Sequence, residues 1–345
     1  PGVTTMWAGA GGVLWKTLPL EDTGAELIRI DEHGLAIRGY PFTVLELLVA
    51  GRFFIVLANT LVLALAYLFA RRLLGLLPAF LGFLLVALDP FHLAHSRLLH
   101  LDGLLSSLLF LSLLAYLSYL HGHRLLSLIV SGIAGGLGAL TKSTAAFLVP
   151  TLFLLSAADA WRRRAADGPV QIGRLLWRLA WPLLLWGAVA LLVFVALWPA
   201  MWVDPVGTLA QVSGQALQYA GRGHASPEFF AGQIYADGEV ATPLFYPISY
   251  LWRTSPVVLL GLLLAAVAFL SKQGPFSRAE MRRAIGGLVL YVVAFAALHT
   301  LGAKKFDRYL LPVYAPLDLI AATGWAALAA WFGARRSVVR WRYVA

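Results

Sequence analysis

The chain has 345 residues, of which 60% are hydrophobic and 13% charged, with a mean hydropathy of +0.78. A soluble domain carries roughly 45–50% apolar and about 25% charged residues, so a soluble enzyme and a disordered scaffold are excluded. Its 27 Lys and Arg against 17 Asp and Glu give a net charge of +10, and the absence of Cys excludes disulfides and thiolate metal sites.

Apolar runs long enough to cross a bilayer recur along the chain. A spanning helix needs about 20 mostly apolar residues, and we count about nine such segments. They lie near residues 52–70, 74–88, 103–120, 125–140, 143–158, 179–198, 254–271, 284–301 and 310–332. The sequence therefore predicts an all-α, polytopic integral membrane protein, with one transmembrane domain over residues 1–345 and a polar stretch before the first span.

The fourth and fifth segments are short and meet at a polar break. Gly135, Gly136 and Gly138 precede Thr141-Lys142-Ser143-Thr144. A single helix would be too long here, and irregular backbone at this depth needs a polar lining. We expect two short helices with Lys142 between them.

Loop charges indicate the orientation. Alternate loops hold 16 Lys and Arg against 3 Asp and Glu: residues 71–73, 121–124, 159–178, 272–283 and 333–345. The positive-inside rule places these loops in the cytoplasm, so the charge excess reflects topology and nucleic acid is not an expected partner. The other face carries the polar N-terminal stretch and the long loop 199–253.

The first polar segment on that other face runs from Asp89 to Asp102. Asp89 can cap a short helix that Pro90 begins, and His95 and Asp102, seven residues apart, are expected on one helix face. In one interpretation, Asp89 and Asp102 are both helix caps and the His residues lie among the lipid headgroups. The other is a functional polar cluster, in which Arg97 binds phosphate and a carboxylate holds a metal or an acceptor hydroxyl. The spacing matches no strong zinc pattern.

A second polar block covers residues 302–312. Lys304, Lys305 and Arg308 lie on the face that the positive-inside rule depletes of cations. They either snorkel to lipid headgroups or bind a phosphate or pyrophosphate on a lipid-linked substrate. Lys142 is a further cation on that face.

The long loop contains two more features. Residues 205–220 have the pattern of an amphipathic helix lying in the membrane interface. His224 follows as a candidate ligand or acid/base group, although it also fits a surface position. Asp318, inside the last span, is expected to make a hydrogen bond within the bundle.

Five stretches stand out together: Pro1-Gly2-Val3-Thr4-Thr5-Met6-Trp7 and residues 87–102, 140–143, 198–202 and 304–312. The first resembles the "HPGVTTMW" stretch of bacterial members of the protein O-mannosyltransferase family of GT-C glycosyltransferases. The others resemble further stretches of that family, in the same order. The resemblance implies a GT-C-like bundle with extracytoplasmic interfacial helices.

The resemblance also implies an activity. Such enzymes transfer a sugar from a polyprenyl-phosphate donor, with inversion, to a hydroxyl of a protein, envelope glycan or lipid. Arg97 and Asp102 match the family's Arg and Asp, and Lys304, Lys305 and Arg308 match its late basic block. We expect Asp102 to be catalytic, Lys142 to join the phosphate-binding cations, and His95 and His224 to be possible substrate or metal contacts. A divalent metal is a possible cofactor.

In the family, the presumed base is an acidic pair upstream of the stretch in which this chain begins. We therefore expect the chain to be incomplete at its N-terminus, since Asp31-Glu32 is a poor substitute for that pair. The expected location is a bacterial inner or plasma membrane, with the active face extracytoplasmic. The alternatives are a non-catalytic subunit that keeps the fold, and a transporter or flippase of an anionic lipid, which should show inverted repeats.

Overall fold

A computed structural model describes residues 2–17, 29–31, 34–36, 43–164, 172–221, 227–236, 239 and 242–342. Its α-helices are α1 (Val3–Thr17), α2 (Val44–Leu74), α3 (Leu76–Leu88), α4 (Pro90–Ser96), α5 (Leu101–Gly122), α6 (Leu125–Thr141), α7 (Leu148–Arg164), α8 (Ile172–Ala196), α9 (Ala200–Val203), α10 (Pro205–Gly221), α11 (Phe245–Arg253), α12 (Pro256–Ser271), α13 (Ala279–Leu301) and α14 (Tyr314–Arg342). Three 3₁₀ helices are η1 (Ser143–Phe147), η2 (Gly274–Ser277) and η3 (Asp307–Val313). Two antiparallel hairpins pair β1 (Arg29–Asp31) with β2 (Gly34–Ala36), and β3 (Glu228–Phe230) with β4 (Gln233–Tyr235).

Each predicted apolar segment coincides with a helix, but the count of nine spans is not confirmed. Within the described residues, seven helices are long and apolar enough to cross a membrane, or up to eight if α3 and α4, bent by 67°, form one span. With 17 residues, α6 is apolar but shorter than these seven helices. At 1.5 Å per residue it measures roughly 26 Å, against about 30 Å of hydrocarbon core.

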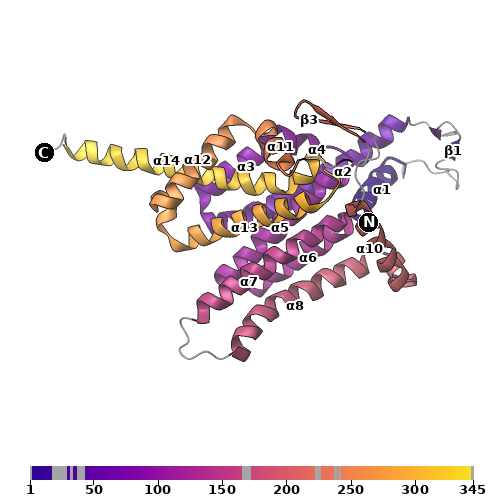
Figure 1. Ribbon diagram of the computed structural model, residues 1–345, viewed down its shortest axis with the longest axis horizontal. Coiled ribbons are helices and arrows are strands. Elements are labelled where there is room, and N and C mark those ends of the chain that lie inside the picture. The colour runs from indigo at the N-terminus through magenta and orange to yellow at the C-terminus, as the bar shows by residue number, and fades with distance from the viewer. Residues whose placement is uncertain are drawn as a thin grey trace.

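The N-terminal stretch, described from the sequence only as polar, contains a helix that was not predicted. Residues 3–17 form helix α1, which packs along α2 (Figure 1). The two backbones approach closely, because a Cβ placed on Gly12 would lie 2.4 Å from the carbonyl oxygen of Ala50. Beyond this crossing, the ring of Trp15 stacks on Phe53 at 5.9 Å.

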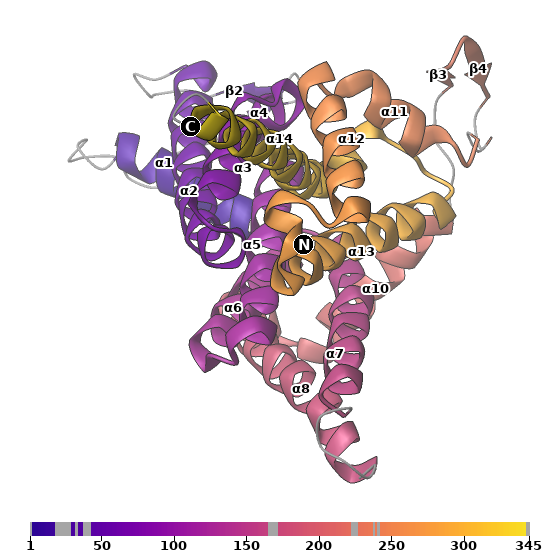
Figure 2. The same cartoon turned by 90° about the vertical axis from the view of Figure 1, so that its left-hand side faces the viewer.

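Helix α5 is the centre of the bundle (Figure 2). Its sequence is apolar all round, as expected of a helix with neighbours on every side, and α2, α6, η3, α7, α13 and α14 contact it. Ser112 of α5 and Ser131 of α6 satisfy their hydroxyls by reciprocal bonds, each donating to the other's carbonyl oxygen at 2.8 and 2.7 Å. In Figure 2, α6, α7 and α8 form an arm on one side of this axis.

Small residues allow α6 and α8 to pack closely. A Cβ on Gly136 would lie 2.5 Å from the carbonyl oxygen of Ala190, and Gly132 is similarly tight against Val189 and the Trp186 carbonyl. Glycines at positions i and i+4 are a common device for close helix contact in membranes. Here they hold α6 in place, and α6 ends next to Lys142.

Gly136→Ala is expected to lower stability by about 1–3 kcal/mol, the usual effect of overpacking a tight contact. The matched control is Gly187→Ala on α8, where a Cβ would meet nothing within 4 Å. Thermal unfolding in detergent should show a lower midpoint for the first variant and no decrease for the second. Equal midpoints would contradict the packing described here.

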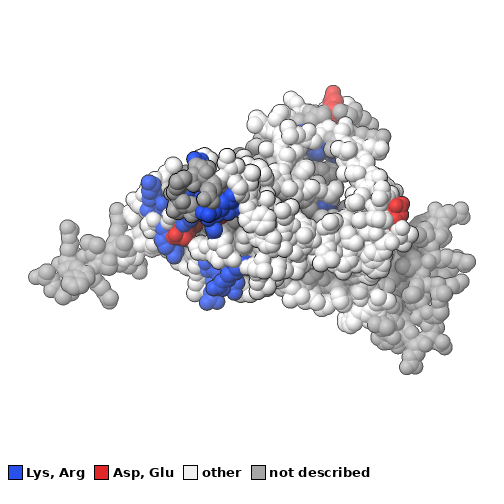
Figure 3. Space-filling view, turned by 90° about the horizontal axis from the view of Figure 1, so that it is seen from below, with Lys and Arg blue, Asp and Glu red and all other residues white. Residues whose placement is uncertain are grey.

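Charge and interfacial elements separate along the bundle. Lys and Arg side chains gather toward the end where α14 terminates (Figure 3). Helices α1, α4 and α10 lie toward the opposite end (Figure 1). The predicted helix over 205–220 is confirmed as α10. The basic loops and the polar segments thus lie at opposite ends, as the alternating loops predict.

Candidate functional site

The segment from Asp89 to Asp102 forms two helices at a sharp turn. Asp89 caps α4 by accepting the backbone N–H of His92 at 2.6 Å, with Pro90 at the first position, as predicted. However, α4 ends at Ser96 and α5 begins at Leu101. The expectation that His95 and Asp102 share one helix face is therefore wrong, because the helix that would align them is broken.

Two contacts fix this turn. Asn59, buried in α2, donates to the carbonyl oxygen of Ser96 at 3.1 Å and accepts the hydroxyl of Ser107 at 2.8 Å. A Cβ on Gly103 would lie 2.7 Å from the carbonyl oxygen of His95, so only glycine permits α4 and α5 to approach this closely. Together they present Asp102 from the first turn of α5.

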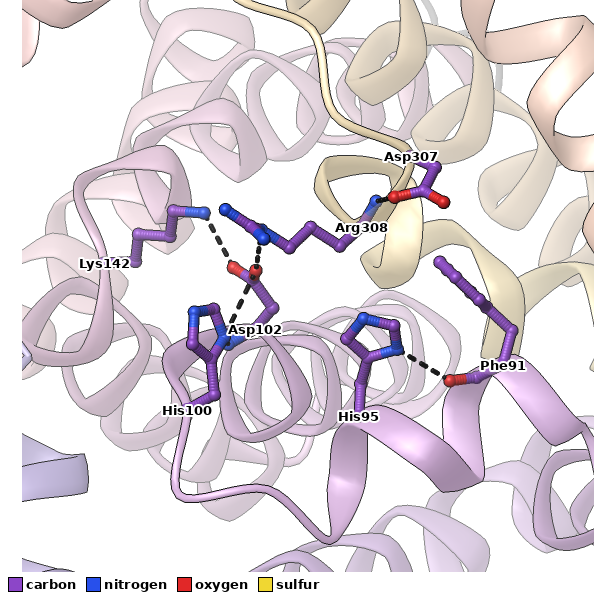
Figure 4. Close-up of polar contacts among 7 residues, drawn as sticks. All are labelled: Phe91, His95, His100, Asp102, Lys142, Asp307 and Arg308. Carbon is purple, nitrogen blue, oxygen red and sulfur yellow. Dashed lines mark hydrogen bonds and ion pairs between the residues drawn. The ribbon is translucent and has the colours of Figure 1, made fainter. Parts of the chain in front are cut away.

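Asp102 is the centre of a charged cluster (Figure 4). Its side chain is 2% exposed, and its Oδ1 accepts a hydrogen bond from Lys142 Nζ at 2.6 Å. Arg308 Nε lies 3.4 Å from Asp102 Oδ2, an ion-pair distance without hydrogen-bond geometry. The helix start, the α6–η1 break and η3 thus bring together an acid and two cations that are far apart in sequence.

Lys142 occupies the predicted break between two short helices. Helix α6 ends at Thr141, Lys142 is extended, and η1 begins at Ser143. The first turn of α1 secures this break, since Gly2 N–H donates to the Thr141 carbonyl at 3.0 Å and the Thr4 and Thr141 hydroxyls lie 2.6 Å apart. Burial lowers the pKa of Lys142, and the Asp102 carboxylate opposes that shift, so Asp102 stabilises the charged form.

The late basic block divides into different environments. Lys305 is 2% exposed, and its ammonium donates to the carbonyls of Thr300 and Gly302 at 3.1 and 3.0 Å, which favours a role in closing the end of α13. Arg308 is held through its backbone N–H, which donates to Asp307 Oδ1 at 2.7 Å. Asp307 Oδ2 in turn accepts from Arg253 at 2.7 Å.

The Arg308 guanidinium keeps its donors available. It is 39% exposed and makes no hydrogen bond to any residue in the described part of the chain. A guanidinium has five N–H donors in a planar fork that suits phosphate. Lys142 and Arg308 against Asp102 leave a net positive charge, so the cluster is suited to binding an anion.

His100 borders the cluster as a neutral ring. Burial lowers the pKa of His100; the Asp102 carboxylate acts in the opposite direction, while Arg308 and Lys142 lower it further. At neutral pH its Nδ1 therefore accepts the backbone N–H of Asp102 at 3.4 Å and carries no charge to pair with the carboxylate. His100 thus contributes to the shape of the site, and the net charge is unchanged.

The other predicted residues that the structure describes have different surroundings. Arg97 is exposed; its backbone N–H donates to the carbonyl of His95, and its side chain makes no hydrogen bond or ion pair within the described ranges. His95 bonds through Nδ1 to the carbonyl of Phe91 at 2.9 Å, within its own helix. Lys304 lies over the ring of Phe306 at 5.5 Å. His224 and Glu32 fall outside the described residues, and Asp31 is described only in its backbone strand.

The possible divalent metal finds no ready-made site here. Across the described residues, no three His, Asp or Glu side chains are grouped so that they could hold a metal ion. Asp102 has its oxygens directed to cations, an unfavourable arrangement for a metal ligand.

Sequence analysis did not single out the aromatic residues that accompany these cations. Tyr309 lies beneath Lys142, with 4.2 Å from Nζ to the ring centroid, and Phe306 faces Arg308. The only available signal was their position inside the basic block, because the contact between Tyr309 and Lys142 joins residues that are far apart in the sequence.

Residues 44–199 match the profile of a family described as dolichyl-phosphate-mannose-protein mannosyltransferase. ArnT from Cupriavidus metallidurans bound to undecaprenyl phosphate superposes with a TM-score of 0.55 and 15% identity, over 94% of this chain and 55% of that one. Its apo state gives 0.50 and 19%, over 80% and 45%. No curated protein matches the sequence.

These likenesses confirm the GT-C membrane fold that the resemblance implied. The chain spans about half the length of ArnT. At under 20% identity the shared feature is the fold, and the chemistry must be argued from the residues of this chain.

Proposed function

We propose that this protein is a membrane glycosyltransferase that takes a sugar from a polyprenyl-phosphate donor and transfers it to a hydroxyl acceptor. The observation that carries the proposal is the half-exposed Arg308 guanidinium, which makes no hydrogen bond within the described residues, next to Lys142. The family profile over residues 44–199 and the undecaprenyl phosphate named for ArnT support this class of donor.

The donor phosphate binds to Arg308 and Lys142. The guanidinium supplies paired N–H donors and the ammonium supplies a point charge. In this proposal Lys304 and Arg97 are secondary candidates for phosphate binding, whereas the hydrogen bonds of Lys305 to the Thr300 and Gly302 carbonyls favour a role at the end of α13.

In the reaction, the acceptor oxygen attacks the anomeric carbon from the side opposite the phosphate. The acceptor O–H and the bond from the anomeric carbon to the phosphate oxygen break, while a new C–O bond forms with inversion. The electron pair stays on the leaving oxygen, so the phosphate gains negative charge. Lys142 and Arg308 then bind the transition state more strongly than the donor, which is the condition for acceleration.

Asp102 orients the cations in this proposal. Its Oδ1 accepts a hydrogen bond from Lys142 at 2.6 Å and its Oδ2 faces Arg308 at 3.4 Å, so both oxygens are directed at the two cations. The proposal therefore gives Asp102 a positioning role, in place of the catalytic role expected from the sequence, and assigns removal of the acceptor proton to a separate general base.

The site lies on the extracytoplasmic side in this proposal, because the basic loops lie at the opposite end of the bundle. The bacterial inner or plasma membrane is the corresponding location. Mannose is the sugar that the family profile favours, and a protein or envelope glycan or lipid is the acceptor.

The test uses the purified full-length protein in nanodiscs. We expect it to bind a polyprenyl monophosphate and to bind the matching uncharged polyprenol at least tenfold more weakly, because only the phosphate engages the cations. With a polyprenyl-phosphate mannose and an acceptor hydroxyl, release of polyprenyl phosphate should accompany glycosylated product. Binding without transfer would instead support a non-catalytic subunit or flippase, and equal binding of both lipids would refute the phosphate site.

A further inference from the structure

Two aromatic rings, Phe306 just before η3 and Tyr309 within it, contact the two cations of the site. Lys142 Nζ lies 4.2 Å from the centroid of the Tyr309 ring, and Arg308 Cζ lies 4.3 Å from that of Phe306. The two rings contact each other edge to face at 5.2 Å. Each cation is therefore held between a ring and the shared carboxylate of Asp102.

A ring and a carboxylate restrain a cation in different ways. A carboxylate removes one unit of net charge, whereas the ring attracts the cation through its quadrupole and leaves the charge intact. With a second acid in place of either ring, the cluster of Lys142, Arg308 and Asp102 would be neutral. The rings therefore allow two like charges to be held near each other while the site stays positive.

The Tyr309 ring is itself supported from below. The ring of His299 lies 6.0 Å from it, and His299 contacts Phe147 at 4.7 Å and Phe295 at 4.5 Å. The Nδ1 of His299 is 3.1 Å from the carbonyl oxygen of Phe295, which fixes the imidazole on α13. The ring beneath Lys142 is thus part of a packed aromatic stack.

We infer that Tyr309 and Phe306 are positioning residues, whose ring faces hold Lys142 and Arg308 in place for an anionic group. This inference rests on the proposed function for the identity of that group, a polyprenyl phosphate. The ring of Tyr309, and not its hydroxyl, is the active part. Its loss leaves Lys142 with one restraint, the contact with Asp102.

Tyr309→Leu and Tyr309→Phe separate the ring from the hydroxyl. The first measurement is the rate at which an amine-selective acylating reagent modifies Lys142, followed by mass spectrometry of the intact protein in nanodiscs. The rate should rise roughly 3- to 30-fold in Tyr309→Leu, the range that a cation–π contact implies. It should stay within twofold in Tyr309→Phe. Phe53→Leu, at the exposed ring stacked on Trp15, is the control and should change nothing.

The second measurement is the affinity for polyprenyl monophosphate, which should weaken over the same range in Tyr309→Leu only. Equal loss in Tyr309→Phe would show that the hydroxyl acts, and an unchanged Tyr309→Leu would remove the ring's role; either result overturns the inference. If the unmodified protein binds no polyprenyl phosphate, the proposed function fails while the acylation result still decides the positioning role. If Tyr309→Leu does not fold, Phe306→Leu with an arginine-selective dicarbonyl reagent tests the same inference at Arg308.

Discussion

Lys142→Met is expected to lower the free energy of unfolding by about 3 kcal/mol, because it removes the short ion pair of the buried Asp102 carboxylate and leaves the longer contact to Arg308. Removing one partner of a buried pair is more costly than removing both, since the remaining charge keeps its desolvation penalty. The double variant Asp102→Asn, Lys142→Met should therefore recover most of the lost stability. Unfolding in a denaturing detergent measures all three proteins.

The matched control for this cycle is the pair of Glu280 and Arg283, 2.9 Å apart with both side chains about half exposed. Arg283→Met should leave the unfolding transition close to that of the unmodified protein, as for surface ion pairs in general. A double variant at the site that is no more stable than Lys142→Met alone would show that Asp102 and Lys142 are not coupled. Sugar transfer should be absent from both site variants, whatever their stability.

Arg308→Ala is expected to reduce the turnover rate of sugar transfer about 10²- to 10³-fold, the usual effect of losing one preorganised donor to a developing charge. The Michaelis constant for the donor should change less, because the phosphate gains its extra charge only in the transition state. Arg308→Lys keeps the charge and loses the planar fork, so its rate should lie between those of the alanine variant and the unmodified enzyme.

The unfolding midpoint of Arg308→Ala should remain close to that of the unmodified protein, since the guanidinium makes no hydrogen bond within the described residues. Arg52→Ala, an exposed arginine of α2, is the control for general loss of positive charge. Transfer within twofold of normal in Arg308→Ala would remove this residue from the reaction.

Local sequence signals predicted much of the fold and less of the site. Hydropathy predicted the positions of the long helices. Asp89 and Pro90 indicated the start of α4, and the polar residues around Lys142 indicated the break after α6. These features depend on neighbours within a few residues. The amphipathic helix α10 was likewise predicted from the pattern of neighbouring residues.

Long-range partners were beyond such reasoning. Nothing near Asp102 in sequence indicates that its partner is Lys142, 40 residues away, because the pairing depends on how α5 packs against α6. For the same reason the sequence could not show that neighbouring cations of the late basic block have different surroundings. Lys305 bonds to carbonyls at the end of α13, whereas Arg308 points into the site. Helix α1 was missed because its glycines lower helix propensity, and tertiary packing on α2 compensates.

The order in which the three charges occur along the chain has a consequence for synthesis. Asp102 and Lys142 are synthesised first, and in the folded bundle they form an ion pair at 2.6 Å whose two charges cancel, which is easier to retain at depth than either charge alone. Arg308 comes more than 160 residues later, just before α14. The net positive charge of the cluster therefore depends on η3, one of the later segments of the bundle to be synthesised.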